Sequence, residues 1–346
     1  MKMKKLAALF LSGIMMLSLV ACGGGSDSSA TDTSSDEGAV TFDKMTWAAS
    51  TAGADGSNFA AGLEKFAELI SEKTGGAVTV EIYTSDQLTN GNQVDSVQGV
   101  MDGTIDMAFE ADGVWGNFDA AFSIPNLPFL FSSYDDVDDK LINGEGGQYF
   151  ADLMDSKFGV KCIGIGENGF RYITNSKHPV ESMADLQGLK LRVGGSPMLT
   201  DSYKAWGADF TVANWSEVYT GLQTGLYDGQ ENPVAVVDAS SIQEVQKYVT
   251  AWTAQYSAMF MTINGDLYNS LSDELKAIVD ECGKEACAYQ VEVTRQQCDE
   301  YLEKWVNEYD MELTEMTQEA ADEFKEAASG LYDQYSDYNE LITLLS

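Results

Sequence analysis

Arginine is scarce in this chain, and two of its three arginines lie close together. The 346 residues include 55 Asp and Glu against 20 Lys and Arg, and the arginines are Arg171, Arg192 and Arg295. A guanidinium group presents a planar set of donors that binds a carboxylate through two parallel hydrogen bonds. We therefore expect Arg171 and Arg192 to hold a negatively charged group. The alternative at this point is that both form structural ion pairs with the many carboxylates of the chain.

Two carboxylates, Glu110 and Asp112, hold a position that favours a ligand site. They follow a predicted strand at residues 105–109, and ligands of open α/β sheets often bind beyond the ends of strands. A solvated loop accounts for the same two residues equally well. Paired carboxylates occur throughout the chain, so their presence gives no support to glycosidase chemistry.

Sequence motifs give no support to an enzyme. The run GIGENG at residues 164–169 matches a dinucleotide-binding motif by its letters. That motif needs a following helix to bind the pyrophosphate, whereas residues 170–174 have the pattern of a strand. The single histidine, His178, lies in a turn, which argues against histidine-based triads and most metal sites. We therefore expect no enzymatic activity, no cofactor and no metal site.

The cysteines in the body of the chain say little about its chemistry. Cys282, Cys287 and Cys298 lie in one predicted helix, at a spacing unlike that of zinc ligands. We interpret these three and Cys162 as small, partly buried apolar residues. A disulfide involving Cys282, Cys287 or Cys298 stays open, because an exported protein can form one.

The N-terminus has the pattern of a lipoprotein export signal at residues 1–21. Three lysines precede an apolar run at residues 6–20, which is shorter than the roughly 20 residues of a membrane-spanning helix. Small residues then lead to Cys22, whose thiol we expect to carry the lipid. Residues 22–42 are rich in Gly, Ser and Asp and predict a flexible tether. We expect a lipid-anchored body outside the cytoplasmic membrane, on the extracellular face or in the periplasm.

The charge of the body excludes one class of partner. Removal of residues 1–21 takes away three lysines and no acid, so the net charge of −35 becomes −38. A body this acidic repels phosphate groups, and nucleic acid is excluded as a partner. An anionic lipid surface is equally unsuited to bind the body. The remaining length suffices for about two domains.

Helices and strands alternate along the body, and their order predicts an α/β fold with sheets covered by helices on both faces. Strands are expected at residues 44–50, 78–82, 105–109, 160–165, 171–174, 189–193 and 210–212. Helices are expected between and after them at residues 58–73, 93–102, 197–206, 216–226 and 318–335. A periodic run at residues 272–309 predicts a helix much longer than a usual domain helix, which we interpret as a strut between two lobes.

Several long motifs resemble those of the solute-binding subunits of TRAP (tripartite ATP-independent periplasmic) transporters, the DctP family. The longest is WSEVYTGLQTGLYDGQENP at residues 215–233. Upstream motifs occur in the same order as in the family and are DGTID (102–106), NLPFLF (126–131), NGFR (168–171), TNSK (174–177) and DLQGLKLRV (185–193). The resemblance extends over residues 43–340, which is the whole body.

The resemblance implies a two-lobed clamshell like that of periplasmic binding proteins, with a long helix spanning both lobes and a small organic acid between them. We assign residues 43–167 and 257–297 to lobe I, and residues 168–256 and 298–346 to lobe II. The implied partners are a small carboxylate ligand and the membrane permease subunits of the transporter.

The resemblance also assigns roles to residues. In the family, the arginine of the Leu-Arg-Val segment pairs with the ligand carboxylate, and that position is Arg192. The asparagine of the Gln-Glu-Asn-Pro segment, Asn232, contacts the ligand, and Trp215 lines the pocket. Arg171 matches an arginine that contacts the ligand in some members and supports the first arginine in others. Asn168 is expected on the same side of the site.

One departure from the family pattern lies beside the predicted carboxylate site. Gly194 and Gly195 follow the Leu-Arg-Val segment, where proline is most common in the family. Two glycines loosen the turn, because they lack the restriction that proline places on the backbone. The shape of the pocket is therefore expected to differ, whereas the carboxylate-binding role of Arg192 is not.

The expected function is capture of a small organic acid and its delivery to the permease. If Glu110 and Asp112 line the site, they repel a second carboxylate and accept hydrogen bonds from hydroxyl groups. That arrangement favours a hydroxylated monocarboxylate, such as a sugar acid, over a dicarboxylate. If the two residues face solvent instead, Arg171 and Arg192 could hold two carboxylates. The alternative function is a sugar-binding lipoprotein of an ABC importer, whose pocket would be rich in Trp and acids without an obligatory arginine.

Overall fold

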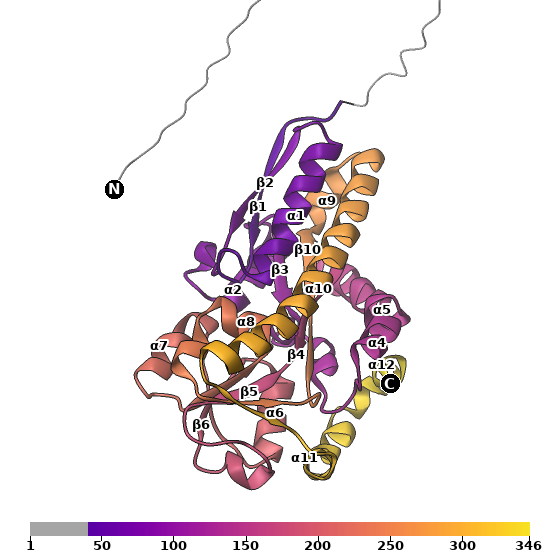
Figure 1. Ribbon diagram of the computed structural model, residues 1–346. Helices are drawn as coiled ribbons and strands as arrows, with labels where there is room; N and C mark the ends of the chain where they lie inside the picture. Colours follow the sequence, from indigo (N-terminus) through magenta and orange to yellow (C-terminus); the bar gives the residue numbers. More distant parts are fainter. Residues whose placement is uncertain (1–40) are drawn as a thin grey trace, which may run out of the picture. The chain divides into compact units, whose positions relative to one another are not determined.

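The computed structural model describes residues 41–346. The predicted signal peptide, Cys22 and the predicted tether up to residue 40 lie outside these described residues. Within residues 41–346, no helix is long and apolar enough to cross a membrane. Two sheets with helices packed around them make up this part of the chain (Figure 1).

The first sheet has five strands in the order β2-β1-β3-β10-β4. Strands β1, β2 and β3 are parallel, whereas β10 runs antiparallel to both of its neighbours. Every residue of β10 is buried, as is usual for a strand that is covered on both faces. The bounds are β1(Met45–Ser50), β2(Val78–Tyr83), β3(Met107–Ala111), β4(Val160–Phe170) and β10(Tyr256–Asn264).

The second sheet has six strands in the order β11-β9-β5-β8-β6-β7. Strand β6 is parallel to both β7 and β8, so the carboxyl ends of these three strands lie at the same edge of the sheet. Ligand sites of α/β sheets commonly lie at that edge. The bounds are β5(Tyr172–Asn175), β6(Lys190–Val193), β7(Asp209–Val212), β8(Gly229–Asn232), β9(Tyr248–Ala251) and β11(Glu312–Glu315).

Helices surround both sheets. Those with α-helical geometry are α1(Asn58–Lys73), α2(Gln93–Asp102), α3(Asp112–Trp115), α4(Tyr134–Val137), α5(Glu145–Leu153), α6(Pro197–Ala205), α7(Val218–Gln223), α8(Val234–Ala239), α9(Gly265–Ser270), α10(Asp273–Glu308), α11(Gln318–Gln334) and α12(Asn339–Leu345). Short 3-10 and π segments are η1(Gln87–Thr89), η2(Ala120–Asn126), η3(Asp138–Ile142), η4(Met154–Phe158), η5(Met183–Leu186), η6(Trp215–Glu217), η7(Ile242–Val245) and η8(Ser336–Tyr338).

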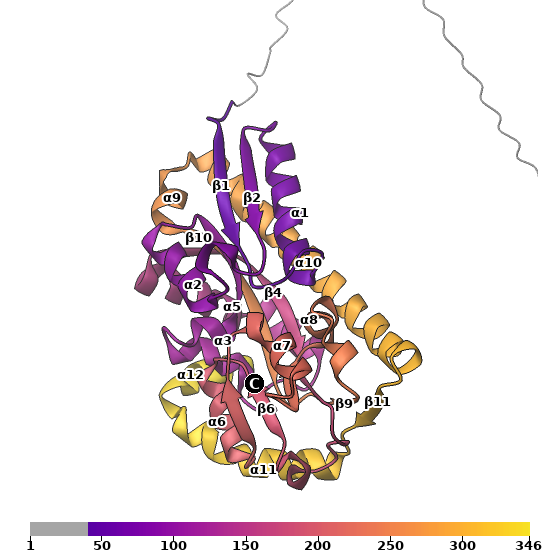
Figure 2. The ribbon, with the colours of Figure 1, turned by 90° about the vertical axis from the view of Figure 1, so that its left-hand side faces the viewer.

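The long helix α10 runs along both lobes, from α1 and α9 down to α8 (Figures 1 and 2). Ser272 caps its N-terminus: the Ser272 side chain accepts from the N–H of Leu275, which satisfies one free donor of the first turn. The helix packs directly on β4 through small residues. A Cβ atom on Gly283 would lie 2.4 Å from the carbonyl oxygen of Ile163, and one on Gly164 would lie 2.6 Å from the carbonyl oxygen of Gly283.

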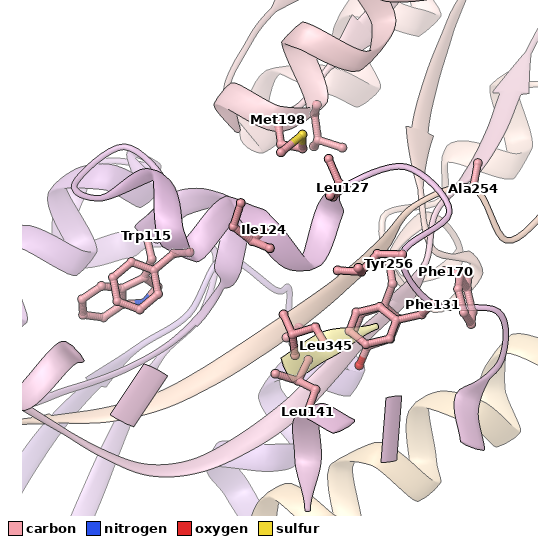
Figure 3. Close-up of a cluster of buried hydrophobic side chains, with 14 of the residues drawn as sticks. Trp115, Ile124, Leu127, Phe131, Leu141, Phe170, Met198, Ala254, Tyr256 and Leu345 are labelled. Carbon is pink, nitrogen blue, oxygen red and sulfur yellow. The ribbon is translucent and has the colours of Figure 1, made fainter. Parts of the chain in front are cut away.

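The chain passes between the sheets where β4 leads into β5, where β9 leads into β10, and through α10 into β11. Aromatic side chains fill the space beside the first two passages (Figure 3). The ring of Tyr256 lies 5.4 Å from the rings of both Phe131 and Phe170, measured between ring centroids. Edge-to-face contacts of this kind stabilise a core beyond the burial of apolar area. The passages are therefore anchored in one shared core.

The predicted α/β, two-lobed architecture with a spanning helix is confirmed, and most predicted elements lie within a few residues of their observed bounds. Strand β4 is longer than predicted, because it continues through the GIGENG run to Phe170. No helix follows that run, so it has no helix N-terminus to bind a pyrophosphate. The hydrophobic pattern of the sequence did not predict β8, β9, β10, β11 or α12.

The last helix, α12, packs against α5 and η2. In Figure 3, Leu345 of α12 lies beside Leu141, and a Cβ atom on Gly146 would lie 2.4 Å from the Leu345 side chain. The end of the chain thus returns to residues assigned to lobe I, although residues 298–346 were assigned to lobe II. The residue ranges of the two lobes stay a proposal.

Candidate ligand-binding site

A cavity of about 380 Å³ is lined by residues from both sheets. Its wall includes the four residues that the resemblance placed at the ligand site, and Asn168, which was expected on the same side. Asn168 lies near the end of β4, Arg192 on β6, and Asn232 at the end of β8. Arg171 joins β4 to β5, and Trp215 begins η6. The fold therefore brings these separate motifs to one place, at the carboxyl ends of the parallel strands.

Arg192 is a buried cation without an acidic partner in the described part of the chain. It is 3% exposed. Its Nε and Nη2 donate to the carbonyl oxygen of Ala213, at 3.0 and 2.6 Å, and its guanidinium carbon lies 5.5 Å from the centre of the Trp215 ring. The carbonyl and the aromatic face hold the group in place. Neither of them carries the full negative charge that would neutralise it.

Arg171, by contrast, is neutralised inside the protein. Its Nε forms an ion pair with the carboxylate of Glu231. Its Nη2 donates to the carbonyl oxygen of Glu231 at 3.2 Å and to Oδ1 of Asn232 at 2.8 Å. Both members of the ion pair are buried. Arg171 therefore acts as a structural cation that also fixes the side chain of Asn232.

The electrostatics of Arg192 follow from these contacts. Burial lowers the pKa of Arg192 to about 10. Repulsion from the charge of Arg171 also lowers this pKa, whereas attraction to Glu231 raises it. The group is still charged at neutral pH. An unpaired buried cation is unfavourable, and a carboxylate in the cavity would supply its missing counter-charge with strong, charge-assisted hydrogen bonds.

Glu231 also fixes the turn after Arg192. Its Oε1 accepts from the backbone N–H of Gly194 at 2.9 Å. Proline has no backbone N–H, so this bond depends on the departure from the family pattern at that position. The next residue, Gly195, accepts a hydrogen bond from Nδ2 of Asn117 at 3.1 Å. These two bonds restrain the turn that two glycines would otherwise loosen.

Glu110 and Asp112 do not form the rim of the cavity, and the prediction that they do is corrected by the structure. Both are completely buried, and neither belongs to the cavity wall. The alternative prediction, that the two residues lie in a solvated loop, is wrong because both are buried. Helix α3 begins at Asp112 directly after β3, and residues from η2 and β10 contact the Asp112 carboxylate.

The two buried carboxyl groups differ in their partners. Within residues 41–346, neither oxygen of Glu110 has a hydrogen-bond partner. Burial, reinforced by the charge of Asp86, raises the pKa of Glu110 well above its usual range. Asp112 accepts from Asn126, Ser257 and two backbone N–H groups. Burial raises the pKa of Asp112 to about 6 and these bonds oppose the rise, so it is ionised at neutral pH.

Sequence reasoning missed part of the cavity wall. Asn126 lies in the NLPFLF motif, which could have identified it, whereas Ser257 lies on β10, a strand that the pattern did not reveal. The hydroxyl of Ser196 donates to Oδ1 of Asn126 at 3.1 Å, which links η2 to the start of α6. The wall also contains the polar residues Gln93, Asn117, Asn214 and Glu217, and the larger apolar residues Phe59, Val94, Val114, Leu199, Val212 and Val236.

The third arginine, Arg295, lies on α10 outside the cavity wall. It forms ion pairs with Asp138 at 2.6 Å and Glu167 at 2.9 Å, and its guanidinium carbon lies 4.5 Å from the centre of the Tyr134 ring. We assign it a structural role. In the described residues the remaining cysteines are free thiols, and no group of His, Cys, Asp or Glu side chains is placed to hold a metal ion.

Two α/β lobes, a helix that spans them and a buried cation in the cavity define an extracytoplasmic solute-binding protein. Residues 49–338 match the family described as bacterial extracellular solute-binding protein, family 7. The chain belongs to this family, the DctP family of TRAP solute-binding subunits. The match gives no support to the alternative of a sugar-binding protein of an ABC importer.

Similar proteins agree with this family. The 2,3-diketo-L-gulonate-binding periplasmic protein YiaO of Escherichia coli K12 is 34% identical over 66% of this chain and 68% of that protein. A TRAP periplasmic solute-binding protein of Ralstonia eutropha H16, solved with (S)-2-acetolactate, is 28% identical, with a TM-score of 0.82 over 87% of this chain and 97% of its own. A TRAP periplasmic solute-binding protein of Polaromonas sp. JS666, bound to D-erythronate, is 26% identical, with a TM-score of 0.82 over 87% of this chain and 98% of its own.

Proposed function

We propose that this protein captures a small hydroxylated monocarboxylate, such as a sugar acid, and delivers it to the membrane permease of a TRAP transporter. The ligand carboxylate binds Arg192, next to Asn232 and Trp215, and Arg171 supports the site through Glu231. One observation carries the proposal. The cavity wall contains a buried guanidinium group that lacks an acidic partner among the described residues.

The ion pairs of the site favour a ligand with one carboxylate. Arg171 is already paired with Glu231, which leaves Arg192 as the one arginine of the described cavity wall without an acidic partner. A second ligand carboxylate near Arg171 would meet the negative charge of Glu231. Glu110 and Asp112 do not contribute to this preference, because both are buried away from the wall.

The ligands named for YiaO and for the two solved structures described above support the same class, whereas two further relatives, 27% and 24% identical, are named for C4-dicarboxylates. 2,3-Diketo-L-gulonate, (S)-2-acetolactate and D-erythronate each have one carboxylate and at least one hydroxyl group. The negative charge of the body does not prevent an anion from binding. At physiological salt, charges separated by more than about 8 Å are largely screened, so Arg192 dominates inside the cavity.

A thermal-shift screen tests the proposed ligand class. We expect D-erythronate, D-galactonate or D-glucuronate to raise the Tm more than succinate, malate, glucose or galactose. A ligand at a hundred times its Kd stabilises the folded state by about 2.7 kcal/mol, which corresponds to about 4 °C for a body of this size. A larger shift with succinate or malate would contradict the monocarboxylate, and a larger shift with a neutral sugar would contradict the Arg192 contact.

We further propose that the body is tethered through a lipid on Cys22, which lies outside the described residues. The small residues before Cys22 and the short apolar run support this proposal. In bacteria that express the chain, Cys22→Ser should leave the protein unprocessed or move it from the membrane fraction to the soluble fraction. Processing and detergent partitioning equal to those of the wild type would refute the lipid anchor.

A further inference from the structure

Asn168 carries an acceptor without a partner in the wall of the cavity. The residue is 3% exposed and lines the cavity, yet within residues 41–346 its Oδ1 has no hydrogen-bond partner. Buried polar atoms are nearly always hydrogen-bonded, and one that is not usually has a functional explanation. The residue lies in the cavity wall, but the Oδ1 atom itself is buried, so a ligand group reaches it as the wall adjusts around the bound ligand.

The orientation of the Asn168 amide is fixed by its neighbours. The carboxylate of Asp112 accepts from the hydroxyl of Ser257 at 2.7 Å, and an ionised carboxylate can only accept. The one hydrogen of the Ser257 hydroxyl is therefore used, and its oxygen accepts from Nδ2 of Asn168 at 3.3 Å. A flipped amide would place two acceptors against each other. The Asn168 amide is thus held with Nδ2 donating to Ser257, and Oδ1 remains without a partner in the described residues.

We infer that Oδ1 of Asn168 accepts a hydrogen bond from a hydroxyl group of the ligand, and that Asp112 is a positioning residue that sets this preference through Ser257. The inference rests on the proposed function, because it needs a ligand in this cavity. It also gives Asp112 a part in recognition, although its side chain does not belong to the cavity wall.

A hydroxyl group is the donor that suits both Oδ1 of Asn168 and a cavity that already contains the cation of Arg192. A second carboxylate offers only acceptors to Oδ1. An ammonium group is a donor, but it would share the cavity with the cation of Arg192 and be repelled by it. A ligand with hydrogen or methyl at this position leaves Oδ1 unpaired, and sites built around a hydrogen bond discriminate strongly against such analogues.

The test is a double-mutant cycle between the ligand hydroxyl and Asn168. Calorimetry compares the wild type and Asn168→Ala, using D-erythronate and its 2-, 3- and 4-deoxy analogues, or the matching D-galactonate set if galactonate binds more tightly. We expect the loss of one particular hydroxyl to weaken binding to the wild type at least tenfold, and binding to Asn168→Ala less than threefold. Equal losses in the two proteins at every position would overturn the inference.

Two further variants guard against loss of structure. Asn175→Ala is a matched control, because Asn175 is also buried and its Nδ2 also lacks a partner in the described residues, but it lies outside the cavity wall. It should lower the Tm and leave every affinity unchanged. If Asn168→Ala fails to fold, Ser257→Ala provides the test, since it frees the Asn168 amide to flip and should reduce the hydroxyl preference at least threefold. Full preference in Ser257→Ala would contradict the inference.

The positioning role of Asp112 has its own readout. The amide introduced by Asp112→Asn can donate to Ser257 and so reverse the chain of hydrogen bonds. We expect this variant to lose the hydroxyl preference and to bind the critical deoxy analogue within threefold of the wild type. A uniform loss of affinity for all ligands would show that Asp112 is merely structural.

Arg192→Ala separates this inference from the proposed function. If Arg192→Ala loses carboxylate binding, but the wild type and Asn168→Ala lose equal affinity for every deoxy analogue, the proposed function stands and the hydroxyl contact is wrong. If that variant binds normally, or if the wild type binds succinate and neither sugar acid, the proposed function fails and the inference fails with it.

Discussion

Arg192→Ala is expected to weaken binding of the ligand at least a hundredfold. In the complex, the ligand carboxylate is the counter-charge of a buried cation, and removing one side of a buried charge pair costs about 3–5 kcal/mol. Since each 1.4 kcal/mol is tenfold in affinity, a hundredfold is the lower end of this range. The free protein should stay folded, because Arg192 has no acidic partner in the described residues that its loss would leave unpaired. Calorimetry measures the affinity and circular dichroism the fold.

Two variants sharpen this expectation. Lys190→Ala removes the same charge from the same strand, but Lys190 is exposed and lies outside the cavity wall, so its affinity should stay within about twofold of the wild type, as expected for a screened surface charge. Arg192→Lys keeps the charge but loses the paired donors and should give an intermediate affinity. Near-normal binding by Arg192→Ala would show that the carboxylate site lies elsewhere.

Glu231→Gln is expected to have the largest effect on stability. The substitution keeps the shape and the acceptor for Gly194, but it leaves the buried guanidinium of Arg171 without a counter-charge. Breaking a buried ion pair in this way costs about 3–5 kcal/mol, which should lower the Tm by about 5–8 °C. Differential scanning calorimetry without ligand measures the change.

A second substitution shows whether the unpaired charge is the cause. Arg171→Met/Glu231→Gln removes both members of the buried ion pair, so the double variant should be more stable than Glu231→Gln alone. Glu323→Gln, at an exposed position of α11, should leave the Tm unchanged. A Tm of Glu231→Gln within 1 °C of the wild type would mean that Arg171 does not depend on Glu231.

The sequence predicted the chemistry of the site better than its geometry. The scarcity of arginine singled out Arg171 and Arg192, and both line the cavity. Their different roles could not be predicted, because the partner that separates them, Glu231, is one carboxylate among 55 acidic residues. Only the pairing of β5 with β8 places Glu231 opposite Ile173, beside Arg171.

The errors at Glu110 and Asp112 have a physical cause. A strand end followed by acidic residues is typical of a solvated edge, and the pattern contained nothing that would cover it. In the structure, Asn126 and Ser257, which are far from Asp112 in sequence, supply the hydrogen bonds that allow a buried carboxylate. Ser257 lies on β10, whose uninterrupted burial removes the alternation by which half-buried strands are usually predicted.

A structure of the protein with its bound ligand tests the central claim most directly. Crystals grown with the sugar acid that gives the largest thermal shift should show the ligand carboxylate about 2.7–2.9 Å from the nitrogens of Arg192. They should also show a ligand hydroxyl within hydrogen-bond distance of Oδ1 of Asn168. A carboxylate bound away from Arg192, or a neutral group against its guanidinium, would contradict the account.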